Sequence, residues 1–353
     1  PTITNSLVSN NIAEGSASAH GGGFFIDDYS NPEILNSQII NNVSQDDGAG
    51  LHISGSSQPL LNNVLINNNN SGRYGGGLYS SSSFTILTLI NVEITNNTAS
   101  KGAGIYLWNS TAILDSLQIR NNEAGGSGGG MLISGSNPQL SNISISENSA
   151  LSGGGLCLEN AFPTFSVDNR CNIYSNTILN GGSGADINIH YSNFSNMIPV
   201  IVDTFTVFNP SDYYTSPVHA FSFDILNAIE DSLINHDLYV SVDGDNNNEG
   251  TSITAPFKTI DYALRRIYSD SLNIHTIHVA PGTYSPSTNG EIFPINIIDF
   301  IDLSGQDQNT TILDAQGSGG VINLSNSSYN IIIENFTITN GNTSYGGGIK
   351  IYN

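Results

Sequence analysis

The sequence predicts an all-β solenoid, a parallel β-helix with coils of about 27 residues, from two observations. The first is a glycine cluster that returns between residues 21 and 155 at intervals of 27, 27, 27, 26 and 25 residues. Self-similarity at a fixed period of roughly 20–50 residues is the signature of a repeat architecture. The second is the alternation of apolar and polar residues within each period, which is typical of strands and leaves no sustained helical period.

The glycine that begins each cluster is predicted to be a turn residue. A turn before a strand requires a positive φ or a close approach between backbones, and either condition excludes a Cβ. A short apolar segment follows each cluster, for example at residues 24–26 and 105–107, and is expected to form the strand. The predicted turn glycines are Gly21, Gly48, Gly75, Gly102, Gly128 and Gly153.

Each period closes on asparagines, which are predicted to form a ladder inside the solenoid. Strands of successive coils stack about 4.8 Å apart, and each coil buries its apolar face only against its neighbours. Stacked amide side chains hydrogen-bond one another and their turn backbones. The asparagines are Asn41 and Asn42, Asn67 to Asn70, Asn96 and Asn97, Asn121 and Asn122, Asn148, and Asn176.

The repeat motif resembles that of right-handed parallel β-helix proteins of the pectin-lyase-like superfamily, especially secreted bacterial ones. It stands here as Gly-Gly-Gly-Phe-Phe-Ile at 21–26, Asn-Pro-Glu-Ile-Leu-Asn at 31–36 and Asn-Asn at 41–42. The resemblance covers almost the whole chain and implies a right-handed coil. It says little about function, because the superfamily contains lyases, hydrolases, adhesins and phage tailspikes.

Three segments follow from the chain order. Residues 1–198 are predicted to be coils, and residues 199–235 to be a C-terminal cap and linker, since a solenoid needs atypical elements that cover its core. Apolar residues at 224–235 lie at roughly helical spacing, so this stretch is expected to be a short helix or a linker. Residues 236–353 are predicted to be an N-terminal cap and the first coils of the next β-helix.

The N-terminal cap is inferred from a second resemblance to the same superfamily. Leu-Tyr-Val-Ser-Val-Asp-Gly at 238–244 and Ala-Pro-Phe-Lys-Thr-Ile at 255–260 resemble the strand, turn and capping helix that begin those proteins. This likeness implies a short helix with one buried apolar stripe. The stripe would consist of Ile260, Ala263, Leu264 and Ile267.

The order of these segments is inverted, with coils and a C-terminal cap preceding an N-terminal cap and more coils. The eight residues at 346–353 and the twenty at 1–20 would together make 28 residues, close to one coil. We expect end-to-end continuation, either between repeats of a longer chain or between stacked subunits, and such non-closing contacts build fibres. The alternative is an arbitrary boundary or a circular permutation. The expected junction residues are Pro1, Thr2, Ile3, Ile349, Ile351, Tyr352 and Asn353.

Composition excludes some partners. The net charge is −22, from 30 acidic and 8 scattered basic residues, so we expect no nucleic-acid partner. No segment approaches the ~20 apolar residues that span a membrane and no signal peptide is present, so we expect no membrane insertion. An acidic surface rich in Asn, Ser and Thr suits an extracellular or cell-surface protein, and a chain that starts at Pro1 without Met is expected to be a processed or excised piece.

Catalytic residues are not evident. The lyases of the superfamily use a basic residue and its hydrolases use clustered aspartates, but the basic residues here lie at unequal offsets within the coils. The pairs Asp27-Asp28 and Asp46-Asp47 are expected to be solvated loop residues, and the seven histidines are dispersed. Cys157 and Cys171 are expected to be core residues on different sides of the coil, with a disulfide as the alternative.

One loop resembles a calcium site. Oxygen ligands alternate at Asp243, Asp245, Asn247 and Glu249, although the glutamate that usually closes such a loop is replaced by Ala255. The alternative is a simple Asn/Gly turn. The expected cofactors are therefore none, or calcium.

We therefore expect a structural, non-enzymatic module of an extracellular filament, stalk or adhesin, whose partner is another copy or repeat of itself. The alternative is a β-helix that binds surface glycans or cleaves polysaccharides in a groove along its coils.

Overall fold

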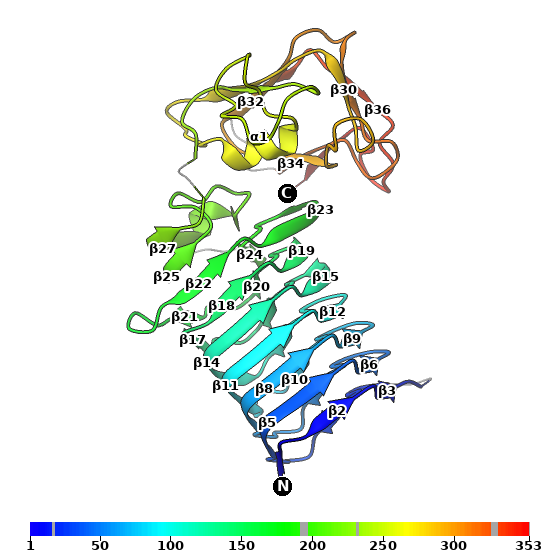
Figure 1. Cartoon of the computed structure of the whole chain (residues 1–353), viewed down its shortest axis with the longest axis vertical. Helices are drawn as coiled ribbons and strands as arrows, with labels where there is room; N and C mark the ends of the chain where they lie inside the picture. Colours follow the sequence, from blue (N-terminus) through cyan, green and yellow to red (C-terminus); the bar gives the residue numbers. More distant parts are fainter. Residues whose placement is uncertain (16–17, 191–196, 231–232, 326–330, 353) are drawn as a thin grey trace. The chain divides into compact units, whose positions relative to one another are not determined.

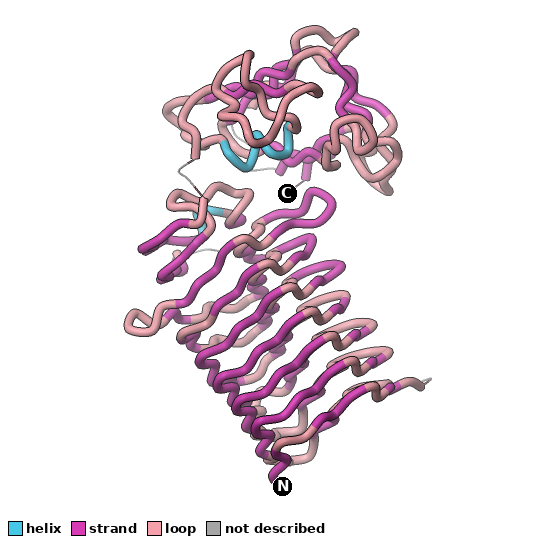
Figure 2. Tube along the Cα trace, viewed as in Figure 1, coloured by secondary structure: helices cyan, strands magenta, loops and turns pink. Residues whose placement is uncertain are grey.

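The computed structural model describes all residues except 16–17, 191–196, 231–232, 326–330 and 353. The chain divides into two compact units. Unit 1 comprises residues 1–210 and 214–230, and unit 2 comprises residues 211–213 and 231–353. Both units are parallel β-helices (Figures 1 and 2), so the fold is the all-β, right-handed parallel β-helix with one short helix that the sequence predicts.

Unit 1 winds three parallel sheets around one core, and most coils contribute a strand to each. The first sheet contains β1 Thr2–Thr4, β2 Leu7–Ser9, β5 Glu33–Ile40, β8 Leu60–Asn67, β11 Ile86–Thr95, β14 Thr111–Arg120, β17 Gln139–Ser141, β18 Ser144–Ser146, β21 Thr164–Phe165, β22 Cys171–Tyr174, β25 Ile198–Phe205 and β27 Phe221–Ala228. The second sheet contains β4 Phe24–Ile26, β7 Leu51–Ile53, β10 Leu78–Ser81, β13 Ile105–Trp108, β16 Met131–Ser134, β20 Leu156–Glu159, β24 Ile187–His190 and β26 Thr215–Ser216. The third sheet contains β3 Ile12–Ala13, β6 Val43–Ser44, β9 Asn70–Ser71, β12 Thr98–Ala99, β15 Glu123–Ser127, β19 Ser149–Ser152 and β23 Thr177–Ser183.

The core of unit 1 is a set of vertical columns of like residues. Strand pairing is in register, so residues one period apart become Cα partners. Branched aliphatic side chains suit such a stacked, pleated surface. The clearest column, in which every member is buried, consists of Ile39, Ile66, Ile94, Ile119, Ile145 and Ile173.

The predicted asparagine ladder is confirmed, and it uses one asparagine of each group. The Oδ1 of Asn97 accepts hydrogen bonds from the backbone N and the Nδ2 of Asn69, at 2.9 and 3.0 Å. The preceding residue takes a left-handed conformation, as Asn68 and Asn96 do with φ of 54°, and this turn directs the next side chain inward. The buried ladder comprises Asn42, Asn69, Asn97, Asn122, Asn148 and Asn176.

The ladder ends on an aspartate. Asp186 is fully buried, and its Oδ1 accepts hydrogen bonds from the backbone N and the Nδ2 of Asn176. Burial raises the pKa of Asp186 to about 7, and hydrogen bonds from Thr206 and Asn176 offset only part of this effect.

We expect Asp186→Asn to stabilise unit 1 at alkaline pH. An unfolded aspartate loses its proton near pH ~4, so stability falls as pH rises from about 4 to 7, where only the folded chain retains the proton. The variant should gain roughly 2–4 kcal/mol at about pH 8 and little at about pH 4, as measured by urea denaturation. Asp168→Asn removes the same charge at an exposed site and is the control. Equal gains for both variants, or a gain independent of pH, would contradict the assignment.

The glycine clusters serve both roles that the sequence predicts as alternatives, a turn with positive φ and a close approach between backbones. The first glycine of each cluster has positive φ, between 59° and 70° for the six predicted turn positions. The third glycine meets the next coil instead: a Cβ on Gly104 would lie 2.3 Å from the carbonyl oxygen of Gly130. Only glycine satisfies both conditions along the whole stack.

The described part of the stretch at 224–235 contains no helix, so the helical one of the two alternatives is wrong for those residues. Residues 221–228 form β27, which pairs with β25 from Ile198↔Phe221 to Phe205↔Ala228. Hydrogen bonding to the free edge of β25 favours a strand here, although the apolar residues lie at helical spacing. A 3₁₀ turn, η1 (Val218–Ala220), precedes the strand.

Unit 2 has three further parallel sheets and the predicted helix. They comprise β28 Leu238–Val240, β29 His275–Val279, β32 Ile301–Gly305 and β35 Ile333–Glu334; β30 Gly282–Tyr284, β33 Thr311–Asp314 and β36 Thr337–Thr339; and β31 Ile295–Ile297, β34 Ile322–Ser325 and β37 Ile349–Tyr352. The helix α1 (Ile260–Arg266) is capped by the hydroxyl of Thr259, which accepts from the backbone N of Tyr262. Its apolar stripe is buried.

Two smaller points concern the cysteines and the helices. Cys157 and Cys171 are buried free thiols in β20 and β22, on different sheets, so the core role is confirmed and the disulfide is not formed. Among the residues that the structure describes, no helix is long and apolar enough to cross a membrane.

Candidate functional site

The N-terminal end of unit 1 presents four edge strands. β1, β2, β3 and β4 each pair with a strand of the next coil, and no described strand covers their other edge. Such an edge carries a row of unpaired N–H and C=O groups. The apolar column is uncovered too: Ile3 and Val8 are half-buried, whereas their partners Ile34 and Ile39 are completely buried.

The C-terminal end of unit 2 is open in the same way. β35, β36 and β37 are the last strands of their sheets. Ile349 in β37 is 44% exposed, whereas its partner Ile322 is fully buried. Within the described residues, no further coil buries the inward face of this one.

Residues 331–340 in the last coil of unit 2 share several backbone features with residues 1–10 in the first coil of unit 1. Left-handed residues lie five apart at Asn5 and Asn10 and again at Asn335 and Asn340. The degree of burial agrees at nine of the ten positions when residues 1–10 are compared with 331–340. Gly346 before β37 has φ of 66°, as Gly21 before β4 has φ of 68°. The two open coils therefore match over these ten positions and at the turn glycine.

The predicted junction residues belong to these two faces. Pro1, Thr2 and Ile3 lie in or beside β1. Ile349, Ile351 and Tyr352 lie in β37, and Asn353 lies outside the described residues.

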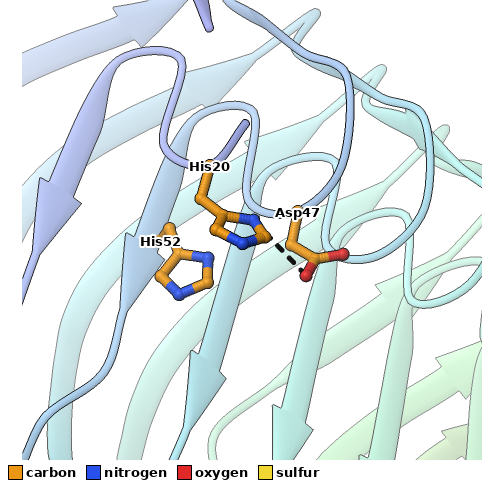
Figure 3. Close-up of side chains that lie close together, drawn as sticks. All are labelled: His20, Asp47 and His52. Carbon is orange, nitrogen blue, oxygen red and sulfur yellow. Dashed lines mark ion pairs between the residues drawn. The ribbon is translucent and has the colours of Figure 1, made fainter. Parts of the chain in front are cut away.

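A cluster of polar side chains lies beside the turn glycines of the first two coils (Figure 3). It contains His20, Asp47 and His52, whose potential ligand atoms all lie within 4.8 Å of one another. His20 and Asp47 each precede a turn glycine, and His52 lies four residues after one. The position before the turn glycine, occupied by His20 and Asp47, and the position four residues after it, occupied by His52, form two adjacent columns along unit 1. The second column contains Phe25, His52, Tyr79 and Tyr106, which are Cα partners in turn.

Burial and charge shape this cluster. Asp47 is 6% exposed, its Oδ2 lies 3.5 Å from the Nδ1 of His20, and its Oδ1 lies 4.0 Å from the Nε of Arg73. Burial raises the pKa of Asp47, and the charges of Arg73 and His20 counteract this shift. Burial, together with the nearby His20, lowers the pKa of His52 to about 4, so His52 is a neutral imidazole at neutral pH.

The cluster corrects two expectations. The seven histidines are not all dispersed, because His20 and His52 come together, with ring centroids 4.6 Å apart. Asp47 is buried and not solvated, because its backbone pairs with Tyr74 on the next coil. The sequence signal available was that His20 and Asp47 share one offset from the turn glycine and lie in one column, while His52 lies at another offset close to the same turn.

The predicted calcium loop is closed by its own hydrogen bonds. The Oδ1 of Asp245 accepts from the backbone N and the Nδ2 of Asn247, at 2.9 and 2.8 Å. Among the described residues, Asp243, Asp245 and Glu249 do not converge to the spacing that His20, Asp47 and His52 reach. The arrangement fits the alternative of an Asx-type turn.

A shallow polar groove of about 330 Å³ runs across the first sheet of unit 1. Left-handed asparagines of successive coils line it, and the Nδ2 of Asn63 donates to the Oδ1 of Asn36 at 2.8 Å. Its described lining offers one carboxylate, Glu93, which forms an ion pair with Arg120. Glycoside hydrolysis ordinarily uses two carboxylates.

Comparisons with known proteins agree with the fold. Residues 1–117 match the family described as "right handed beta helix region", and residues 242–353 match a family described as "protein of unknown function (DUF1565)". Each match covers about a third of the chain. No curated protein and no solved structure matches the chain significantly.

Proposed function

Because the chain is a right-handed β-helix repeat protein, we propose that it is a structural module that continues end to end to build an extracellular filament, stalk or adhesin. In this role the C-terminal face of unit 2 stacks on the N-terminal face of unit 1, from a second copy or from a neighbouring repeat of a longer chain. No catalytic step is part of the proposal.

The observation that carries the proposal is the matching conformation of the two open coils. Left-handed asparagines at the same spacing and the same order of buried and exposed residues allow one coil to continue from the other in register. Stacking would pair backbone groups that are open at both edges and cover the half-buried column at Ile3 and Val8. The contact is heterologous and does not close, so repetition gives a fibre.

The surface supports an extracellular setting. With a net charge of −22 and few basic residues, copies of the chain repel one another, whereas the uncovered edges of β1 to β4 and of β35 to β37 offer backbone groups for pairing. This distribution favours growth along the helix axis.

We expect Val8→Lys to weaken end-to-end assembly at least about tenfold, so that no fibres form at concentrations just sufficient for the wild type. The lysine charge would stand in the apolar column that stacking buries, and losing the burial of one valine costs about 1.5 kcal/mol or more, a tenfold or greater rise in the concentration needed for assembly. Leu7→Lys is the matched control, because Leu7 points outward and is 60% exposed. Electron microscopy and sedimentation measure the assembly.

The outcomes separate the alternatives. Fibres in the wild type and in Leu7→Lys, but single particles in Val8→Lys, support the proposal, and the mass under denaturing conditions distinguishes joined repeats from stacked subunits. Single particles of the wild type at every concentration would contradict it. Binding of glycans would then become the leading function, with the asparagine-lined groove as the site to test.

A further inference from the structure

We propose that His20, Asp47 and His52 form a binding site for a divalent transition-metal ion of the zinc type. The site would join the first coil of unit 1 to the second, since His20 lies on one and the other two residues on the next. It is independent of the end-to-end stacking proposed above.

The donor atoms are buried, and their hydrogen-bonding capacity is unused. Within the described part of the chain, the Nδ1 of His20, the Oδ1 of Asp47 and the Nδ1 of His52 have no hydrogen-bond partner. A buried polar atom without a partner costs roughly 1–3 kcal/mol. A bound cation would remove this cost at all three atoms.

The spacing is close to that of a coordination sphere. Zinc bonds of about 2.0–2.2 Å in tetrahedral geometry place neighbouring ligand atoms about 3.4 Å apart. The three donors lie within 4.8 Å of one another, so small side-chain rotations complete the site. Three protein ligands leave a fourth position open, as in zinc sites that bind water or another small ligand.

The donor set selects the class of metal. Two imidazole nitrogens and one carboxylate suit zinc and neighbouring transition metals, whereas calcium and magnesium prefer oxygen ligands only. The positive charge of Arg73, whose Nε lies 4.0 Å from the Oδ1 of Asp47, opposes cation binding, but this side chain is half-exposed and also lies over the ring of Tyr74. The overall charge of −22 favours cation binding.

The surroundings hold the ligands in place. The ring of His52 lies between Phe25 and Tyr79, with centroid distances of 5.2 and 5.1 Å. The segment that carries His20 is bound on both sides, since the Oδ2 of Asp46 accepts from the backbone N of Ala19 and the carbonyl of Asp47 accepts from the N of Gly21. Side chains held in this way lose little conformational entropy when they bind a metal ion.

The test is titration of the chelator-treated chain with Zn²⁺ near neutral pH by calorimetry. We expect one Zn²⁺ per chain, and about a hundredfold or larger loss of affinity in Asp47→Asn, which keeps the shape of the side chain, and in His20→Gln, which alters a partly exposed residue of the first coil. His278→Ala is the control: His278 also contacts an aspartate, Asp237, but outside the cluster.

A second measurement locates the ion and does not depend on affinity. Zn²⁺ should slow amide hydrogen exchange in residues 18–26 of the wild type and not of Asp47→Asn. The proposal would be overturned by no binding at millimolar Zn²⁺, by unchanged affinity in both cluster variants, or by loss of binding in His278→Ala alone.

Discussion

Gly104→Ala is expected to destabilise unit 1 by about 3 kcal/mol or more. The new Cβ would lie 2.3 Å from the carbonyl oxygen of Gly130, and close to Ile119 and Asn122 as well. The nearest atom belongs to the backbone of the next coil, so no side-chain rotation relieves the contact and the coils must separate locally. That separation stretches the parallel strand pairs on both sides of the turn.

The matched control is Gly125→Ala, in which the added Cβ meets nothing within 4 Å. We expect the free energy of unfolding of this variant to lie within about 0.5 kcal/mol of the wild-type value. Urea denaturation gives the comparison, with hydrogen exchange around residues 102–106 as the local readout. Similar losses of stability for the two alanine variants would disprove the role of close coil contact.

Asn97→Ala is expected to cost about 3–5 kcal/mol, because it interrupts the buried ladder in both directions. The backbone N and the Nδ2 of Asn69 would lose their acceptor on Asn97. On the other side, the carbonyl of Ile66 and the Oδ1 of Asn122 would lose a donor, at 3.1 and 2.9 Å. Alanine leaves the buried backbone N of Asn69 without this acceptor and removes one hydrogen bond from each of the other groups, which costs more than the net value of the bonds.

Asn70→Ala provides the control in the same coil. Asn70 is exposed and accepts a hydrogen bond from Thr98, so its loss should change stability by less than about 1 kcal/mol. Urea denaturation of both variants measures the difference in stability. If the m-value stays constant, the shift of the denaturation midpoint reports the change in the free energy of unfolding. If the exposed asparagine proved as important as the buried one, the ladder would not be the stabilising element.

The sequence by itself determined the solenoid, its period and the role of its repeated residues. In a β-helix every coil contacts its neighbours one period away, so residues at equal offsets must stack, and a linear pattern maps directly onto contacts. The turn positions of Gly75 and Gly102 and the ladder formed by the asparagines follow from that rule. The helix α1 was equally accessible, because its apolar stripe and the capping Thr259 are local signals.

Only the tertiary structure decided which residues at unequal offsets meet. His20 and Asp47 share one offset from the turn glycine and His52 has another, and the tight bend between the two columns is what brings their donor atoms together. The same holds for β27, where pairing with β25 overrides the helical spacing of the apolar residues. Contacts across a bend and along a free sheet edge depend on the path of the backbone in space, and that path is not contained in the repeat period.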